Sequence, residues 1–197
     1  QELLFSSPLG ETDFTAANGA GSLSVPTSIV ALKVFREILY VFGQDKIFKI
    51  SGDNIANFRV DSVTQTLGCA DGFSVQELGG DLLFLSLDGL RTIAGTERIG
   101  DVELGTISKT IQRRITDVVS STDNITSSIV RAKSQYRLFY PSNGGSVDSS
   151  QGILATLKRN FQTGQIGFEF ADIRGIKPSA MSSGFIDGKE AILEGGY

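Results

Sequence analysis

Five carboxylates are the residues whose type could support acid–base chemistry: Asp88, Asp101, Glu103, Glu169 and Asp172. Two such groups on either side of a glycosidic bond are what a glycosidase needs. Three of them have a simpler structural explanation. Asp88 precedes a glycine in a turn, Asp101 stands before an expected helix, and Glu169 alternates with phenylalanines along a strand. The sequence therefore favours a protein without catalytic residues, and we expect no enzyme activity.

Residue types that serve most other catalytic and metal sites are scarce. The chain has no histidine, which excludes imidazole ligands and His-based general-base catalysis from within it. Its one cysteine, Cys69, cannot form an internal disulfide and has no local base, so we expect a small buried residue. Asp53 and Asn54, like Asp123 and Asn124, lack the ligand spacing of an EF-hand loop, and turns explain them better. We expect no cofactor and no metal.

Composition fits a folded protein of one or two domains, with 197 residues, of which 40% are hydrophobic and 20% charged. The net charge of −4 argues against a general polyanion-binding surface, because Lys and Arg make the phosphate contacts. It still permits a wall along which nucleic acid passes without sticking. No apolar run approaches the roughly 20 residues of a membrane span. No signal peptide is apparent, and both ends suggest a fragment of a longer protein.

The expected elements are organised around a hairpin within residues 79–95. Residues 82–87 form an almost unbroken apolar run, and residues 90–94 return as a second strand. Between them, Asp88 and Gly89 predict a tight type I′ turn, because both central positions of that turn need φ > 0. Replacing this glycine by valine should therefore destabilise the fold.

A second stretch, residues 39–52, repeats this pattern 43 residues earlier. Asp45 corresponds to Asp88, and Gly52 corresponds to Gly95. A repeat of about 40–50 residues built on hairpins is typical of propeller blades. The alternative is that two hydrophobic hairpins resemble each other by composition alone. The residues expected to have structural turn roles are Gly43, Gly52, Gly79, Gly80, Asp88, Gly89 and Gly95.

Short strands separated by turns continue along the chain without intervening helices, which favours an antiparallel all-β fold over βαβ units. We predict part of an antiparallel β-propeller. Residues 1–27 are expected to form an extended N-terminal arm or loop, and residues 28–197 the blades. The expected strands are residues 28–35, 38–42, 46–51, 57–63, 73–78, 82–87, 90–94, 128–133, 135–140, 153–158 and 166–171, followed by a last hairpin over 185–193 that turns at Asp187 and Gly188.

One segment has helical periodicity. Isoleucines recur four residues apart from Ile107 to Ile115, which places them on one face of a helix. We predict a short helix over residues 106–115. Arg113 and Arg114 then lie late in the helix, where its dipole favours cations, and we expect them on a solvated or interface face rather than in a phosphate site.

Several motifs recur together in one protein family. They are a Phe-Gly turn with a later closing glycine (Phe42, Gly43, Gly52), FLSLDGLR at 84–91, ELGTISKTI at 103–111, YRLFYP at 136–141 and GFEFADIRGI at 167–176. On these residues the chain resembles the propeller-bearing tail nozzle or tail tubular proteins of short-tailed bacteriophages, and the related packaged-DNA stabilisation proteins. The resemblance covers residues 29–197 and rests on structural motifs.

What the resemblance implies is a role rather than a reaction. Such proteins form a ring, usually a hexamer, at the end of the portal and adaptor. The ring carries the DNA channel, retains packaged DNA until ejection, and offers docking surfaces to tail fibres or neighbouring subunits. The resemblance supplies no catalytic residues. It implies a virion protein of the phage tail, with DNA passing through the channel without sequence-specific binding and with no membrane-spanning segment.

A receptor- or carbohydrate-binding β-propeller of a phage or cell surface is the alternative function. That function predicts aromatic and polar side chains that converge on one exposed pocket. A glycosidase or other propeller enzyme is the third hypothesis, and it requires one of the carboxylates above to be essential for hydrolysis.

Overall fold

The computed structural model describes residues 1–94, 106–120, 124–141, 150–159 and 166–196. Its contacts divide the chain into two units, which we call unit 1 (Gln1–Cys69) and unit 2 (Ala70–Tyr197). Across the described residues the chain is mostly β, with antiparallel sheets and one short α-helix. The expected antiparallel β class is confirmed at this level.

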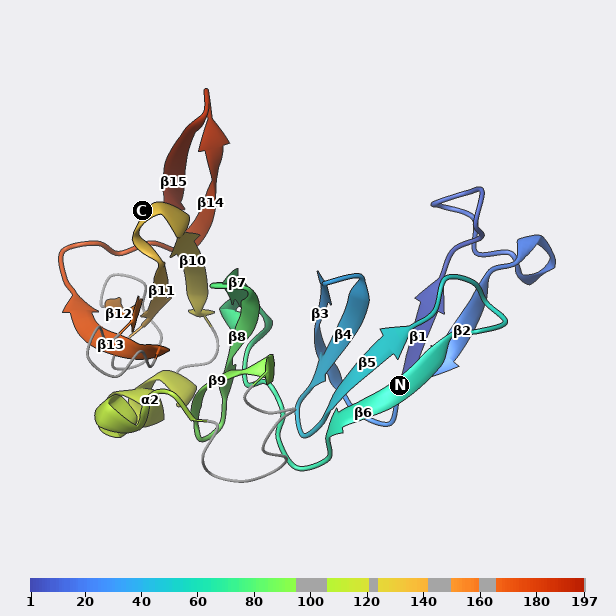
Figure 1. Cartoon of the computed structure of the whole chain (residues 1–197), viewed down its shortest axis with the longest axis horizontal. Coiled ribbons are helices and arrows are strands. Elements are labelled where there is room, and N and C mark those ends of the chain that lie inside the picture. The colour runs from blue at the N-terminus through green and yellow to red at the C-terminus, as the bar shows by residue number, and fades with distance from the viewer. Residues whose placement is uncertain (95–105, 121–123, 142–149, 160–165, 197) are drawn as a thin grey trace. The chain divides into compact units, whose positions relative to one another are not determined.

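Unit 1 contains a two-stranded hairpin and a four-stranded antiparallel sheet (Figure 1). The hairpin lies within residues 1–27, which were expected as an extended arm or loop. The sheet runs in chain order, each strand pairing with the next. Buried Val25, Val41, Phe48 and Ile50 form its core. The strands are β1 (Glu2–Phe5), β2 (Gly21–Ser24), β3 (Ile29–Phe35), β4 (Ile38–Gly43), β5 (Ile47–Ser51) and β6 (Arg59–Thr64).

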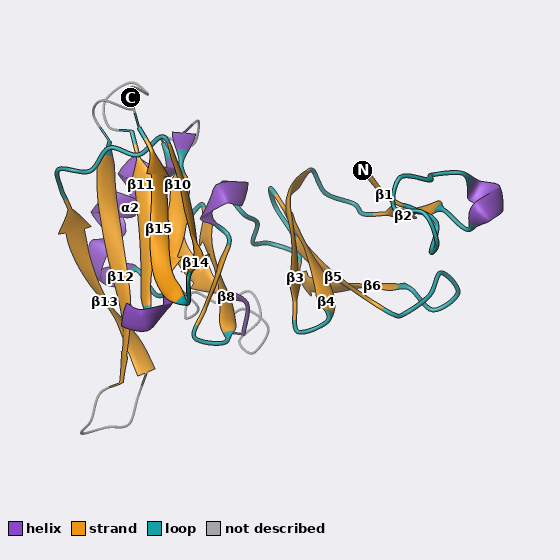
Figure 2. Ribbon diagram, turned by 90° about the horizontal axis from the view of Figure 1, so that it is seen from above, coloured by secondary structure: helices purple, strands orange, loops and turns teal. Residues whose placement is uncertain are grey.

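The described residues of unit 2 form three antiparallel sheets of three, four and two strands, each again in chain order. Figure 2 shows the four-stranded sheet with the helix α2 behind it. The elements are β7 (Gln76–Leu78), β8 (Asp81–Ser86), β9 (Gly89–Thr92), α2 (Gln112–Val119), β10 (Thr126–Val130), β11 (Gln135–Tyr140), β12 (Gln151–Arg159), β13 (Ile166–Ile173), β14 (Ala180–Ile186) and β15 (Lys189–Gly195).

The repeat of 43 residues is present in the strand register of both units. Six Cα pairs among β3, β4 and β5 recur among β7, β8 and β9, with both partners displaced by 43 residues. Similar composition alone would not reproduce the register of two successive strand pairs. Corresponding Cα partners are Phe35–Ile38 with Leu78–Asp81, Lys33–Tyr40 with Gln76–Leu83, and Phe42–Ile47 with Leu85–Leu90.

The first turn of each meander repeats as well. Arg36 and Glu37 join β3 to β4 with φ angles of 50° and 64°, and Gly79 and Gly80 join β7 to β8 with 63° and 78°. Two consecutive positive φ angles define the type I′ turn, whose twist matches that of the strands it connects. Glycine adopts this conformation without strain, whereas the Arg-Glu pair does not.

A fourth strand position is also repeated. In unit 1, Ser62 of β6 lies opposite Phe48 of β5. In unit 2, Thr106 forms an antiparallel bridge with Arg91 of β9, and the Ile107 N–H donates to the Leu90 carbonyl at 2.9 Å. The chain after β9 therefore lies along the edge of β9 that corresponds to the edge of β5 covered by β6 in unit 1.

The turn after β8 lies one residue earlier than expected. Ser86 pairs with Gly89, so Leu87 and Asp88 form the two-residue loop, and Gly89 begins β9 with a φ of 151°. The Asp-Gly type I′ geometry is found instead in the last hairpin, at Asp187 (φ 49°) and Gly188 (φ 75°), as expected there.

The other turn glycines have different roles. Gly52 follows β5 with a φ of 120°. Gly43 is the last residue of β4, where a Cβ would lie 2.0 Å from the Thr27 hydroxyl oxygen, so close packing requires glycine. Gly95 lies outside the described residues.

The helix begins later than predicted. Residues 106–108 follow β9, with the Ser108 hydroxyl accepting the Leu90 N–H at 3.0 Å, and a 3-10 turn (Lys109–Ile111) then leads into α2. The predicted helix bounds of 106–115 are therefore wrong, because the first isoleucine belongs to this extended segment. Arg113 and Arg114 consequently lie in the first turn of α2, and the predicted favourable dipole interaction is wrong.

Two expected strands are shorter because 3-10 turns replace part of each. The segment at 73–78 contains a 3-10 turn (Gly72–Ser74) before β7, and the segment at 128–133 contains β10 followed by a 3-10 turn (Arg131–Lys133).

The core of unit 2 joins its sheets to α2. Ile115 and Val118 of the helix are fully buried against Leu85, Tyr136 and Leu138 of the sheets. Burying each such side chain contributes about 1.5–3 kcal/mol. The apolar face of the helix is thus what positions its polar side chains over the ends of the strands.

Three first strands of successive sheets, β7, β10 and β14, are linked side by side in unit 2. The Gln76 side-chain amide of β7 donates to the Ser127 carbonyl of β10 at 3.2 Å. On the other side of β10, the Met181 N–H of β14 donates to the Thr126 hydroxyl at 3.0 Å. Strand β10 is buried although it is rich in polar residues, and these hydrogen bonds give its polar groups partners.

Candidate functional site

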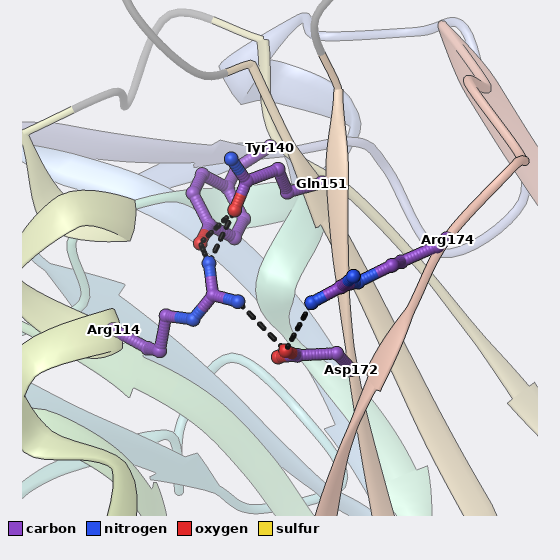
Figure 3. A network of polar contacts seen from close by, with 5 residues as sticks. All are labelled: Arg114, Tyr140, Gln151, Asp172 and Arg174. Atoms are coloured by element: carbon purple, nitrogen blue, oxygen red, sulfur yellow. Dashed lines mark hydrogen bonds and ion pairs between the residues drawn. The ribbon is translucent and has the colours of Figure 1, made fainter.

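A network of five polar side chains lies at one end of the four-stranded sheet of unit 2 (Figure 3). Arg114 comes from the first turn of α2, Tyr140 ends β11, and Gln151 begins β12. Asp172 lies near the end of β13, and Arg174 follows that strand.

Strand register brings these positions together. Tyr140 lies opposite Gln151, and Ile153 lies opposite Asp172. The end of β11, the start of β12 and the end of β13 therefore lie at the same end of the sheet, because neighbouring antiparallel strands run in opposite directions. Because the apolar face of α2 packs on the sheet, the helix places Arg114 over this end of the sheet.

Arg114 is the centre of the network. Its Nη2 donates to Asp172 Oδ2 at 2.7 Å, and its Nη1 donates to Gln151 Oε1 and, at 3.5 Å, to the Tyr140 hydroxyl. Arg174 Nη2 lies 3.8 Å from the same Asp172 oxygen. The Tyr140 hydroxyl donates to Gln151 Oε1 at 3.4 Å. One carboxylate thus faces two guanidinium groups.

Burial raises the pKa of the Tyr140 hydroxyl, although the nearby Arg114 guanidinium opposes the shift. Tyr140 therefore remains a protonated donor across the physiological range. The hydrogen bond to Asp172 raises the pKa of Arg114. With both arginines charged against one carboxylate, the network has a formal charge of +1.

Two small hollows share this network. One, of about 240 Å³, is lined by polar and apolar groups alike, from Ile111, Arg114, Ile153, Phe170, Ala171 and Asp172. The other, of about 280 Å³, has the more polar lining Arg114, Ser150, Gln151, Gly152, Asp172, Ile173, Arg174 and Gly175. Arg114 and Asp172 belong to both, so the ion pair stands between the two spaces.

The carboxylates singled out by type do not converge on this site. Asp88 pairs with Arg91, whose guanidinium is almost fully buried, and this hydrogen bond lowers the pKa of Asp88. Glu169 pairs with Lys158 on the surface. Asp172 lines both hollows. Asp101 and Glu103 lie outside the described residues.

The other candidates are accounted for structurally. Cys69 is buried, as predicted. Asp53 accepts hydrogen bonds from the side chains of Asn54 and Asn57 in the loop after β5, so turn chemistry explains it. Asp123 lies outside the described residues. Among the residues that the structure describes, no group of three potential ligands from His, Cys, Asp and Glu could hold a metal ion. No helix in the described ranges is both long and apolar enough to cross a membrane.

Sequence reasoning missed four of the five network residues. Arg114 was expected on a solvated or interface face, whereas it is half-buried against Asp172. Tyr140, Gln151 and Arg174 were not singled out. The signal in the sequence is that polar residues begin or end three adjacent strands, but only the register shows that these ends meet.

Comparison with models of known protein families and with curated protein sequences gave no match for this chain.

Proposed function

We propose that this chain is a structural, non-enzymatic component of a bacteriophage tail. In this proposal it forms blades of a β-propeller in a tail nozzle or tail tubular ring. The ring conducts packaged DNA and retains it until ejection. Its mechanism is architectural, because rigid sheets hold a channel open and their loops contact neighbouring proteins.

The observation that carries the proposal is the relation between successive sheets of unit 2. Sheets arranged around an axis bring the same strand of each sheet together near that axis. The hydrogen bonds of Gln76 with Ser127 and of Met181 with Thr126 join first strands in this way. If further sheets make the same first-strand contacts, the series closes into a β-propeller.

The repeated meander supports the same reading. The strands β3–β5 and β7–β9 share their order and register, and a bridge at Thr106 lies at the position that corresponds to β6. A period of about 40–50 residues with four strands is typical of propeller blades. A single sandwich would not require the same register in successive sheets.

The assignment to a phage tail rests on the motif resemblance of residues 29–197 and on charge. A net charge of −4 suits a wall that DNA passes without tight binding. We propose a homo-hexamer as the ring, with the head–tail adaptor and tail fibres as protein partners and the virion tail as its location.

Light scattering and negative-stain imaging of the complete purified protein test this function. The proposal predicts a mass of about six subunits and a ring whose central hole admits duplex DNA. If the protein alone is a monomer, the same measurements are made with its adaptor. A monomer under both conditions contradicts the proposal.

A further inference from the structure

We propose that the two hollows around Arg114 and Asp172 bind one acidic sugar unit, a uronic acid. The proposal concerns unit 2 alone and does not depend on a role in a phage tail. It goes beyond architecture, because it gives the chain a specific small-molecule ligand.

The polar wall presents both donors and an acceptor to such a ligand. Both guanidinium groups contact the Oδ2 oxygen of Asp172, which leaves Oδ1 without a hydrogen-bond partner among the described residues. Gln151 uses its oxygen within the network, and its amide nitrogen points away from Arg114 (Figure 3), with no acceptor among the described residues. Sugar hydroxyls both donate and accept, and therefore suit this mixture.

Apolar side chains lie on the other side of the Arg114–Asp172 pair from Gln151 and Arg174. Ile111, Ile153 and Phe170 line the smaller hollow beside the Arg114–Asp172 pair. A pyranose ring that lies across the ion pair can pack its C–H face against these side chains while its hydroxyls reach the polar groups of the other hollow. An inorganic anion such as phosphate would leave this apolar surface uncovered.

Charge and size restrict the choice of ligand further. Arg174 has a side chain that is 87% exposed, and its only ionic contact among the described residues is the 3.8 Å one with Asp172. It can therefore pair with an incoming carboxylate, and guanidinium groups bind carboxylates in a two-point geometry. Hollows of about 240 and 280 Å³ are smaller than the roughly 300 Å³ at which drug-sized pockets begin, which favours one sugar unit.

The test is an NMR titration of the whole chain with galacturonic acid, with galactose as the matched neutral sugar and acetate as the matched plain anion. We expect shifts of the Gln151 side-chain amide and of the Gly152 and Gly175 backbone amides. Galacturonic acid should bind at least about tenfold more tightly than either comparison compound. A titration with trigalacturonate distinguishes the source of the ligand. If it binds more tightly than galacturonic acid, the natural ligand is a polysaccharide; if the two bind equally, it is a free sugar acid.

Arg174→Gln should weaken binding of galacturonic acid about tenfold. Arg59→Gln is the matched control, because Arg59 is also highly exposed and pairs with an aspartate two residues away, at 3.6 Å, in unit 1. Asp172→Asn should remove the preference over acetate, because it breaks the ion pairs with Arg114 and Arg174 that hold the polar groups in place. The proposal is overturned if galactose or acetate binds as well as galacturonic acid, if Arg59→Gln weakens binding equally, or if no shift occurs.

Discussion

Gly89 is a residue where conformation and packing both require glycine. Its φ of 151° is one that other residues rarely adopt, and a Cβ would lie 2.4 Å from Thr106 Cγ2 and 2.7 Å from the Ser108 hydroxyl oxygen. Gly89→Val should therefore lower the free energy of unfolding through strain and overpacking, each costing about 1–3 kcal/mol. Urea denaturation measures the loss.

Gly184→Val is the control for this prediction. Gly184 also lies in a strand, but nothing is within 4 Å of its Cβ position. Valine there should change stability little. Equal losses from the two variants would contradict the explanation given for Gly89.

Glu190 links the last hairpin to the loop between β10 and β11. Its carboxylate accepts the backbone N–H groups of Ala132, at 2.9 Å, and Arg131, and these hydrogen bonds lower the pKa of Glu190 below its ordinary 4.5. A lowered pKa in the folded state contributes stability that is present above pH 4.5. That stability is lost as the pH falls through the folded pKa. The amide shifts of Ala132 should report this transition in an acid titration.

Glu190→Gln should remove the acid transition from the Ala132 amide, because the side chain no longer titrates. Glu194→Gln, on the same strand, is the matched control and should leave it in place. Persistence of the transition in Glu190→Gln would show that another group controls this contact.

Among the elements, the turn between β3 and β4 carries strain that its counterparts avoid. Glu37 has a φ of 64°, and the corresponding positions in the other two type I′ turns are glycines. Glu37→Gly should raise the free energy of unfolding by about 0.5–1 kcal/mol, because relief of strain exceeds the entropic cost of glycine. The midpoint of chemical denaturation measures the gain.

The reverse substitution in the last hairpin completes this test. Gly188 has a φ of 75° and nothing within 4 Å of its Cβ position, so Gly188→Glu adds strain without a steric clash. It should lower stability by about 1 kcal/mol. Stabilisation by Gly188→Glu would refute the turn argument.

The sequence predicted the hairpins well because their signals are local. Apolar runs interrupted by turn residues predicted the bounds of β4, β5 and β8 to within about one residue. The 43-residue offset in the sequence is also present in the pairing of the strands. The helix was displaced because Ser108 makes a tertiary hydrogen bond with Leu90, which periodicity does not reveal. Tertiary contacts thus overrode a helical pattern of isoleucines.

The candidate site was hardly predictable because none of its residues is unusual in its local context. Arg114 and Asp172 are 58 residues apart, and their contact follows from the register of β12 with β13 and from packing of α2. Inspection of titratable residues pointed to Asp172 by type but could not name its partners.

At the scale of the whole molecule, charge predicts weak interaction with DNA. With 22 acidic and 18 basic residues, the chain offers few cations that could displace counterions from a duplex. Fluorescence anisotropy with a labelled duplex should show no sequence-dependent binding near physiological salt. Tight binding that weakens steeply with added salt would instead indicate a dedicated nucleic-acid surface.

The arrangement of the sheets is the central claim, and cryo-electron microscopy of the purified assembly tests it most directly. We predict that the sheets β7–β9, β10–β13 and β14–β15 of unit 2 lie around one axis, with β7, β10 and β14 nearest to it, in subunits that form a ring with an open channel. Sheets stacked face to face as a sandwich, or an assembly without a channel, would contradict the account.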